Sequence, residues 1–473
     1  MTGKLISDGH ANCFLLIAVA VLMLNIVSQV AAFPLQVILI VYAVVRSDIK
    51  LFPGLFVALL DKSCFPALGA SILKFRLGIS IGAENVFLIS VFLFVVARMI
   101  KNHYSISSTW AIVFAWLISL IPALVMSRQA KADGLAVWQE PIVSFLTPSL
   151  YFWGWSVGRT WDRAKGYFIK RMSLVFLVLN LLAVGGHFYR FSFVYAPLSV
   201  GLAAASFIGR PSRSGRLVAL ACFAAGICNA LFRRYVNIKD TTGYADAAEL
   251  GSTFTVVMTV LFAFAIIGLV CVLMKAGRGV RYLPLLFLVP LVVVFFYASG
   301  RAGGEVVTND VGRDYKNIVE RFEFKLVGDR GAVWADGLND VMTPPHFFKR
   351  YRDRVVMGRD MYGQSVVTLK MPPHNQILTL LVTQGWWLGL FCIIFLFWTH
   401  FRMFRCAAFM QDDQALICSL LTPSAAVFYA VGLTGQSVWS SAFTGNGLVT
   451  LVFPGIVYGA WLCRMKATRA LQF

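Results

Sequence analysis

Long apolar segments separated by short polar turns run through most of this chain. A bilayer core about 30 Å thick needs about 20 apolar residues for each crossing helix. Segments near this length lie around residues 12–31, 34–45, 51–72, 81–98, 106–127, 142–158, 172–187, 194–209, 217–232, 252–274, 282–298, 376–399, 414–432 and 447–463. Several of them are short. The pattern predicts an all-α polytopic integral membrane protein with about 12, and at most about 14, transmembrane helices.

Residues 299–375 form the one long polar stretch, and they divide the chain into three predicted parts. These are an N-terminal transmembrane bundle (1–298), a loop (299–375) and C-terminal transmembrane helices (376–473). Loops longer than about 12–15 residues are usually functional or disordered. This loop is rich in aromatic residues, and apolar residues between Asp314 and Leu338 follow helical spacing. We therefore expect it to be partly helical, with an amphipathic helical hairpin against the membrane face.

Composition supports the membrane assignment. Apolar residues make up 59% of the chain and charged residues 14%, and the mean hydropathy is +0.74. Soluble domains contain about 45–50% apolar and about 25% charged residues. A soluble fold would need a very large core to bury this much apolar surface.

The net charge of +20 follows the same pattern, because most basic residues gather in alternate turns. Cytoplasmic loops of membrane proteins carry an excess of Lys and Arg. The turns assigned to the cytoplasm on this basis contain Arg98, Lys101, Arg159, Arg163, Lys165, Lys170, Arg171, Arg210, Arg213, Arg216, Lys275, Arg278, Arg281, Arg402, Arg405, Arg464, Lys466 and Arg469. The C-terminus is then cytoplasmic, and the loop 299–375 faces outward.

This distribution argues against a nucleic-acid partner. Nucleic-acid-binding proteins gather basic residues on one domain, with aromatic residues among them. Here the basic residues lie beside apolar segments, where anionic lipid headgroups are the natural contact. We expect membrane lipids as partners, and no nucleic acid.

Motifs for soluble chemistry are missing from the chain. There is no His-Glu-x-x-His, no phosphate-binding Gly-rich Lys loop and no Gly-x-Ser-x-Gly elbow. We therefore expect no cofactor and no metal, and a substrate that is already activated.

The first candidate for chemistry is the sequence Pro372-Pro373-His374-Asn375, directly before the apolar segment 376–399. Asn375 stands where a helix N-cap is expected. His374 is then placed at the outer mouth of a membrane helix, where it can accept or donate a proton near pH 7. The alternative is an interfacial histidine that hydrogen-bonds to a loop carbonyl.

The second candidate is a set of arginines on the outer side. Arg330 is followed four residues later by Trp334 in the long loop, and Arg190, Arg234 and Arg301 follow or precede apolar segments. Positive-inside topology does not explain outward arginines, whereas two or three of them can bind an anionic headgroup. The alternatives are a surface pair between Arg330 and Asp329, and side chains that merely reach the headgroup region.

These residues carry a resemblance to a known family. In its layout, with about 12 spans and a long outer loop late in the chain, the protein resembles the bacterial O-antigen ligase/polymerase family. The resemblance extends to two motifs: Arg-x-x-x-Trp (Arg330, Trp334), and His-Asn followed after nine residues by Gly (His374-Asn375, Gly385). The motifs cover mainly residues 325–390. Leu388 stands where the ligase pattern commonly has Gly, Thr or Tyr.

The resemblance implies a metal-independent, inverting membrane glycosyltransferase in the bacterial inner membrane. Its donor would be a glycan on undecaprenyl diphosphate, and its active site would face the periplasm. His374, Arg330 and Arg190 would be catalytic, and Arg234, Arg301, Trp334 and Asn375 would bind substrate. Possible further partners are envelope polysaccharide assembly proteins.

Two reactions fit this implication. A polymerase passes the chain to a glycan acceptor and makes O-antigen or exopolysaccharide, whereas a ligase passes it to lipid A-core. The imperfect ligase pattern favours polymerisation. A polysaccharide flippase or transporter is the main alternative of another class, and a scaffold for envelope assembly is the third. Transporters place charges near mid-membrane, but the spans after residue 100 are nearly free of charge.

Overall fold

The computed structural model describes the helical framework of the chain. It covers residues 6–60, 83–101, 109–132, 139–182, 189–208, 216–218, 220–221, 224, 331–342, 355–359, 365–369, 375–410, 412–428 and 447–470. The apolar segments 252–274 and 282–298 and most of 217–232 lie outside these residues, as does the interval between Asp314 and Arg330. The predicted hairpin of that interval stays a prediction.

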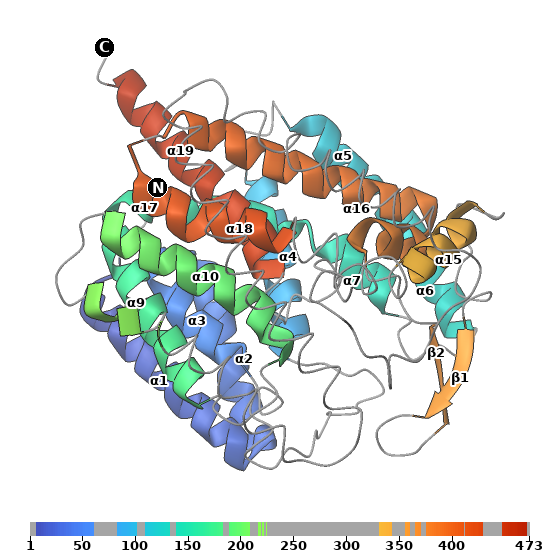
Figure 1. The fold of residues 1–473 in the computed structure, drawn as a ribbon, viewed down its shortest axis with the longest axis horizontal. Coiled ribbons are helices and arrows are strands. Elements are labelled where there is room, and N and C mark those ends of the chain that lie inside the picture. The colour runs from blue at the N-terminus through green and yellow to red at the C-terminus, as the bar shows by residue number, and fades with distance from the viewer. Residues whose placement is uncertain are drawn as a thin grey trace, which may run out of the picture.

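The described residues are mainly α-helical (Figure 1). The helices are α1 (Asp8–Val27), α2 (Gln29–Arg46), α3 (Phe52–Ala58), α4 (Ala83–Ile100), α5 (Trp110–Ile118), α6 (Leu120–Ala132), α7 (Glu140–Leu146), α8 (Ser149–Gly158), α9 (Trp161–Leu182), α10 (Tyr189–Ile208), α15 (Gly331–Met342), α16 (Gln376–Ala408), α17 (Gln414–Leu416), α18 (Thr422–Ala426) and α19 (Phe453–Ala470). A 3-10 turn (Ile49–Leu51) precedes α3, and π-helical turns Ile417–Leu421 and Leu448–Val452 precede α18 and α19. The helical class predicted from the apolar pattern is confirmed.

One antiparallel hairpin interrupts the helical pattern. Strands β1 (Val355–Arg359) and β2 (Ser365–Leu369) pair so that Val355 faces Leu369. Both strands are rich in valine, which favours extended backbone. The hairpin lies in the segment 299–375, and the sequence interpretation of an all-α fold did not foresee it.

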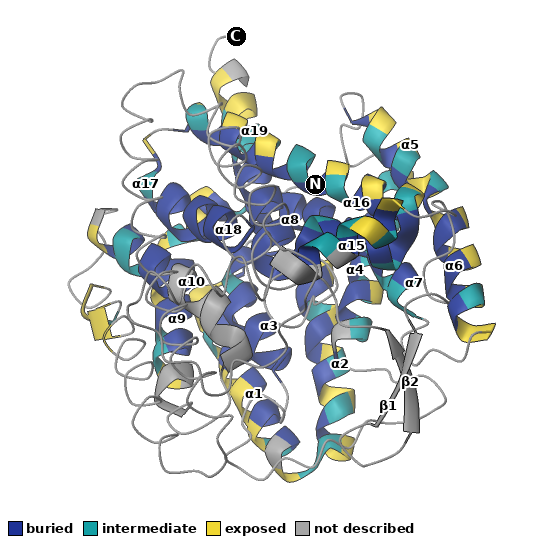
Figure 2. Ribbon diagram, turned by 45° about the vertical axis from the view of Figure 1, so that its right-hand side comes forward, coloured by how far each residue is buried: buried dark blue, intermediate teal, exposed yellow. Residues whose placement is uncertain are grey.

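Five described helical segments are long and apolar enough to cross a membrane. They are Asp8–Asn25, Gln29–Arg46, Trp110–Ala132, Gln376–Ala408 and Leu448–Thr468. Large apolar side chains on them face outward, as the exposed stripes on α1, α5 and α6 show in Figure 2. Phe114 and Ile121 are each 64% exposed. Such extended apolar surface is stable next to lipid. The chain is therefore an α-helical membrane protein.

Two predicted spans each consist of two helices that meet at residues with helical backbone. The segment 106–127 is α5 and α6, joined at Ser119, and 142–158 is α7 and α8, joined at Thr147-Pro148. Proline cannot donate a backbone hydrogen bond and restricts the residue before it, so a helix tends to end there. Ser119 instead donates its hydroxyl to the carbonyl of Trp116, within its own helical turn.

The tightest helix packing joins α8 to α19 through two reciprocal pairs of glycines. Gly154 and Gly158 lie four residues apart on α8, as do Gly455 and Gly459 on α19. A Cβ added at any of the four would stand 2.1–2.3 Å from a backbone carbonyl oxygen of the other helix segment. Small residues spaced by four let two membrane helices approach closely enough for their backbones to touch.

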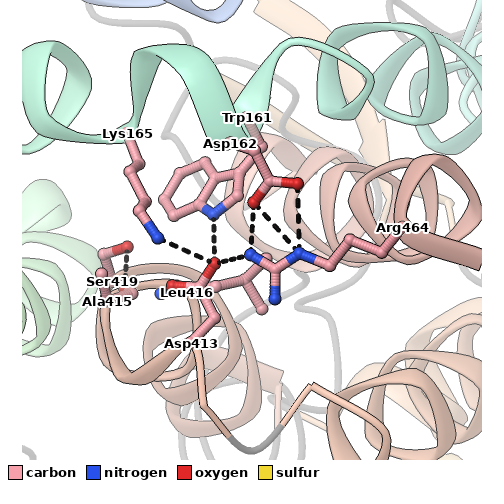
Figure 3. A network of polar contacts seen from close by, with 8 residues as sticks. All are labelled: Trp161, Asp162, Lys165, Asp413, Ala415, Leu416, Ser419 and Arg464. Carbon is pink, nitrogen blue, oxygen red and sulfur yellow. Dashed lines mark hydrogen bonds and ion pairs between the residues drawn. The ribbon is translucent and has the colours of Figure 1, made fainter. Parts of the chain in front are cut away.

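A buried carboxylate ties the ends of α9, α17 and α19 together (Figure 3). Oδ2 of Asp413 accepts a hydrogen bond from the Trp161 indole at 3.0 Å and pairs with Lys165 Nζ at 3.4 Å and with the guanidinium of Arg464. Arg464 also binds both carboxylate oxygens of Asp162. By the charge alternation, this network belongs to the turns assigned to the cytoplasm.

Candidate functional site

The candidate site is built around the start of α16, where Asn375 forms the N-cap. Its side-chain oxygen accepts hydrogen bonds from the backbone N–H groups of Ile377 at 3.0 Å and Leu378 at 3.2 Å. Asn375 is 5% exposed. The cap predicted from the sequence is confirmed. The amide of Asn375 therefore fixes the chain directly after His374. Because this amide is bound to the helix, it cannot also turn freely toward a substrate.

The backbone of α16 is broken at Gly385. This glycine has φ 65° and ψ 178°, a conformation essentially restricted to glycine. A Cβ added at Gly389 would stand 2.6 Å from the carbonyl oxygen of Leu380. In a straight helix these two residues would be about 14 Å apart along the axis. The chain therefore folds sharply at Gly385, and the predicted single span 376–399 is a short helix, 376–384, followed by a long one, 386–408.

The helix α15 packs against the short helix 376–384 (Figure 1). Trp334 and Val341 of α15 form a small apolar cluster with Leu378 and Val382. Trp334 is 1% exposed. Its ring therefore holds the two helices together, whereas the sequence interpretation placed it at headgroup depth beside a bound phosphate.

A hydrogen bond joins the last turn of α15 to the residue after the break. Trp386, directly after the break, donates its indole N–H to the carbonyl of Val341 at 3.2 Å, in the last turn of α15. The C-terminal end of α15 therefore lies near the break that ends helix 376–384.

Helix 376–384 also carries polar side chains. Thr379 and Thr383 lie to one side of Gln376 around the helix and Gln384 to the other, with Leu380 between Gln376 and Gln384. Leu378 and Val382 pack against α15. Gln376, Thr379 and Gln384 are buried, with exposed fractions of 0%, 7% and 1%.

Most of the arginine and histidine candidates lie outside the described residues. They are Arg234, Arg301, Arg330 and His374. Arg190 is the second residue of α10, but its side chain is also outside the description. The structure thus describes two of the predicted site residues in full, Trp334 and Asn375, and brings the helices that carry them into contact.

Sequence reasoning missed the break that ends helix 376–384. The available signals were the two glycines, Gly385 and Gly389, within an apolar run. Within the described residues, no group of three or more His, Cys, Asp or Glu side chains is placed to hold a metal ion. Comparisons with protein-family models, curated proteins and solved structures gave no match to this chain.

Proposed function

We propose that this protein is a membrane glycosyltransferase that polymerises a surface polysaccharide from undecaprenyl-diphosphate-linked glycans. Support comes from the pairing of α15 with helix 376–384. Arg330 directly precedes α15, and His374 directly precedes the cap of α16. The proposal assigns Arg330 and His374 to one active site, because the helices that follow them in the chain pack together.

The chemistry of this region suits a diphosphate leaving group. The N-termini of α15 and α16 carry the positive ends of helix dipoles, which favour an anion. In the proposal, Arg330 and Arg190, with Arg234 and Arg301, stabilise the charge that grows on the departing diphosphate. An arginine fork can do this without a metal ion.

His374 acts on the acceptor in this proposal. It removes the proton from the attacking hydroxyl as that oxygen bonds to the anomeric carbon, and the bond to undecaprenyl diphosphate breaks in the same step. A displacement in one step inverts the configuration at that carbon. Asn375 holds the end of the loop, so that His374 keeps a defined position next to the helix.

The cellular arrangement belongs to the same proposal. The protein has about 12 spans in the bacterial inner membrane, with the loop 299–375 in the periplasm and the C-terminus in the cytoplasm. A ligase that attaches the finished polymer to lipid A-core is the first alternative, because it differs from the polymerase only in the acceptor.

A polysaccharide flippase or transporter is a second candidate, and the broken helix α16 favours it. Transporters commonly use discontinuous membrane helices to bind substrate near mid-membrane. An enzyme remains the better supported proposal, because α15, which follows Arg330 in the chain, packs against the helix that follows His374-Asn375.

Replacing the two central residues tests the proposal. His374→Ala and Arg330→Ala, expressed in the native host, are expected to abolish polymer at normal protein levels, as measured by the length and attachment of the polysaccharide. Short units on the acceptor indicate a lost polymerase, and bare core with long lipid-linked chains indicates a lost ligase. Accumulation of unused glycan on the cytoplasmic leaflet indicates a transporter.

Matched controls come from helices on the predicted cytoplasmic side of the membrane. His10→Ala in α1 and Arg98→Ala in α4 remove the same kinds of side chain there. His10 contacts the Tyr42 hydroxyl, and Arg98 lies over the Phe94 ring. These variants are expected to make wild-type polymer. If His374→Ala and Arg330→Ala also make wild-type polymer, the proposed function is wrong.

A further inference from the structure

Glu140 is an acidic residue that the proposed mechanism does not use. It is the first residue of α7, at the end of the predicted span 142–158 opposite to Arg159, and therefore on the outward side. Its side chain is partly buried and partly exposed, and no described residue forms a hydrogen bond or an ion pair with it. Carboxylates that are withdrawn from water are usually paired, because an unpaired charge is costly there. An unpaired glutamate that a molecule from outside can still reach is therefore a candidate for binding.

Glu140 lies on the side of α7 that faces the protein. Ser144, one helical turn later on the same side, is 1% exposed, and Pro141 is also buried. The helix α7 packs against α4, α6 and α16 (Figure 1). The carboxylate is therefore turned toward other helices and not toward lipid.

Helices α8, α16 and α19 run in the same direction, which fixes the level of α7 along α16. The contacting pairs keep the same order along both chains. They are Gly154 with Val452 and Gly158 with Ile456 between α8 and the α19 segment, and Arg402 with Tyr458 and Phe409 with Trp461 between α16 and α19.

This shared direction places Glu140 level with the break in α16. The ring of Tyr458 contacts Trp155 of α8, at 4.8 Å between ring centroids, and Arg402 of α16, at 4.0 Å from the guanidinium carbon to the centroid. Glu140 precedes Trp155 by 15 residues, and Trp387, at the start of the long helix after the break, precedes Arg402 by 15 residues. The chain passes from α7 to α8 through residues with helical backbone. Both positions therefore lie about 22 Å from the ring along the helix axes.

Burial governs the charge state of Glu140. It raises the pKa of the carboxyl to about 7, because the charged form is disfavoured away from water. No described basic side chain offsets this effect by pairing with Glu140. The ionisable residues on the helices packed against α7 are Glu84 and Arg98 in α4, Arg128 and Lys131 in α6, and Cys392, His400, Arg402, Arg405 and Cys406 in α16.

We propose that Glu140 binds the acceptor sugar, with its ionised carboxylate accepting hydrogen bonds from sugar hydroxyl groups beside the break in α16. The inference rests on the proposed glycosyltransferase function. An ionised carboxylate only accepts hydrogen bonds, and its two oxygens can take them from two hydroxyls at once. It repels a diphosphate, so it suits the acceptor side of the reaction and not the arginine site. A metal ion needs more ligands than this, and the described residues contain no suitable group.

The test measures polymer formation by the full-length protein, reconstituted in proteoliposomes, from lipid-linked glycan extracted from the native host. KM is recorded between pH 6 and pH 8 for wild type, Glu140→Gln and Glu140→Asp. Because the sugar binds the ionised form, the wild-type KM is expected to rise about tenfold from pH 8 to pH 6, as the carboxyl takes up a proton. Glu140→Gln is expected to raise KM at pH 8 about tenfold and to abolish this pH dependence, whereas Glu140→Asp is expected to retain it.

Thermal unfolding separates binding from a structural role. A raised carboxyl pKa means that the folded protein binds the proton more tightly, so ionisation of Glu140 lowers stability above the unfolded pKa of about 4.3. Glu140→Gln is therefore expected to raise the melting temperature at pH 8, and to raise it less at pH 6. A fall in melting temperature and in kcat with unchanged KM overturns the inference, because it indicates a purely structural role.

Asp8→Asn is the matched control, because it makes the same change from carboxylate to amide at an exposed position in α1. It is expected to keep the wild-type KM at each pH. If Glu140→Gln behaves like Asp8→Asn while the wild type is active, acceptor binding by Glu140 is wrong and the proposed function stands. A wild-type protein that makes no polymer refutes the proposed function, and this inference with it.

Discussion

Gly385 decides the direction of the chain at the candidate site. Its backbone lies in a region that other residues enter only at a cost of about 1–3 kcal/mol. The short helix 376–384 can fold back onto the start of the long helix only because this position lacks a side chain. The direction in which helix 376–384 runs against the long helix depends on that single turn.

We therefore expect Gly385→Ala to lower the free energy of unfolding by about 1–3 kcal/mol. Thermal unfolding of the purified protein in detergent measures the effect. Gly166→Ala is the control, because a Cβ at Gly166 in α9 meets nothing within 4 Å, and alanine is the better helix former. A Gly385→Ala protein as stable as the control would mean that the turn is not strained for other residues.

Asp413 is the second residue on which a large part of the fold depends. Its side chain is 1% exposed and meets the charged groups of Lys165 and Arg464. We expect Asp413→Asn to lower the free energy of unfolding by an amount that approaches about 3–5 kcal/mol, because the loss of one partner of a buried ion pair costs this much. The change is measured by thermal unfolding.

The exposed pair between Asp8 and Lys50 provides the comparison for Asp413. The Asp8 side chain is 66% exposed, and pairs of this kind contribute at most about 1 kcal/mol. Asp8→Asn should leave the melting temperature nearly unchanged. Equal effects of the two substitutions would show that burial does not strengthen the Asp413 network.

Residue-level prediction worked where the rule is local. The capping role of Asn375 follows from one residue and the helix after it, and the sequence predicted it. The burial of Trp334 and of Thr379 depends on which helix lies opposite. Nothing in the order of residues specifies that α15 covers one side of helix 376–384, so these features became visible only in the structure.

At the level of helices, the α8–α19 contact is the most sensitive to added volume. At Gly455 a Cβ would stand 2.1 Å from the Tyr151 carbonyl oxygen and 2.9 Å from the Trp155 nitrogen. Both are backbone atoms, so the helices themselves have to move apart. Overpacking of this kind typically costs about 1–3 kcal/mol.

Gly455→Ala is accordingly expected to lower the melting temperature of the purified protein, and Gly9→Ala in α1, where a Cβ meets nothing within 4 Å, is expected not to. Adding Gly154→Ala to the Gly455→Ala protein is expected to lower the melting temperature little further, because both glycines belong to one contact and the helices have already separated. Fully additive losses would show that the glycines act independently.

Apolar length predicted where most described helices lie, because the bilayer requires about 20 apolar residues per span. It did not predict all of their ends: α9 begins at Trp161, against a predicted start at 172, and α16 ends at Ala408, against a predicted end at 399. Breaks within spans were harder to see. Pro148 and Gly385 are visible in the sequence, but a proline or glycine in a membrane helix is often accommodated without a break. The hairpin β1–β2 was missed because its two valine-rich strands are short and lie within a charged segment.

At the scale of the whole molecule, the exposed apolar side chains and the charged turns occupy different places. Large apolar residues of α1, α5 and α6 face outward along the helices (Figure 2), whereas Asp413, Lys165 and Arg464 meet at helix ends (Figure 3). Part of the basic charge of the chain is therefore neutralised within the protein, by ion pairs between helix ends.

The sequence distances spanned by these contacts have a consequence for synthesis. Trp161 and Asp162 bind residues that follow 252 and 302 positions later, and α8 packs its glycines against α19. At about 5–20 residues per second, Asp162 waits about 15–60 s for Arg464 to be made. During that interval the N-terminal helices lie in the membrane while the glycines of α8 and the polar groups of α9 still lack their final partners. Assembly in the membrane therefore ends with a docking step, in which the last helices bind to the surfaces of the first ones.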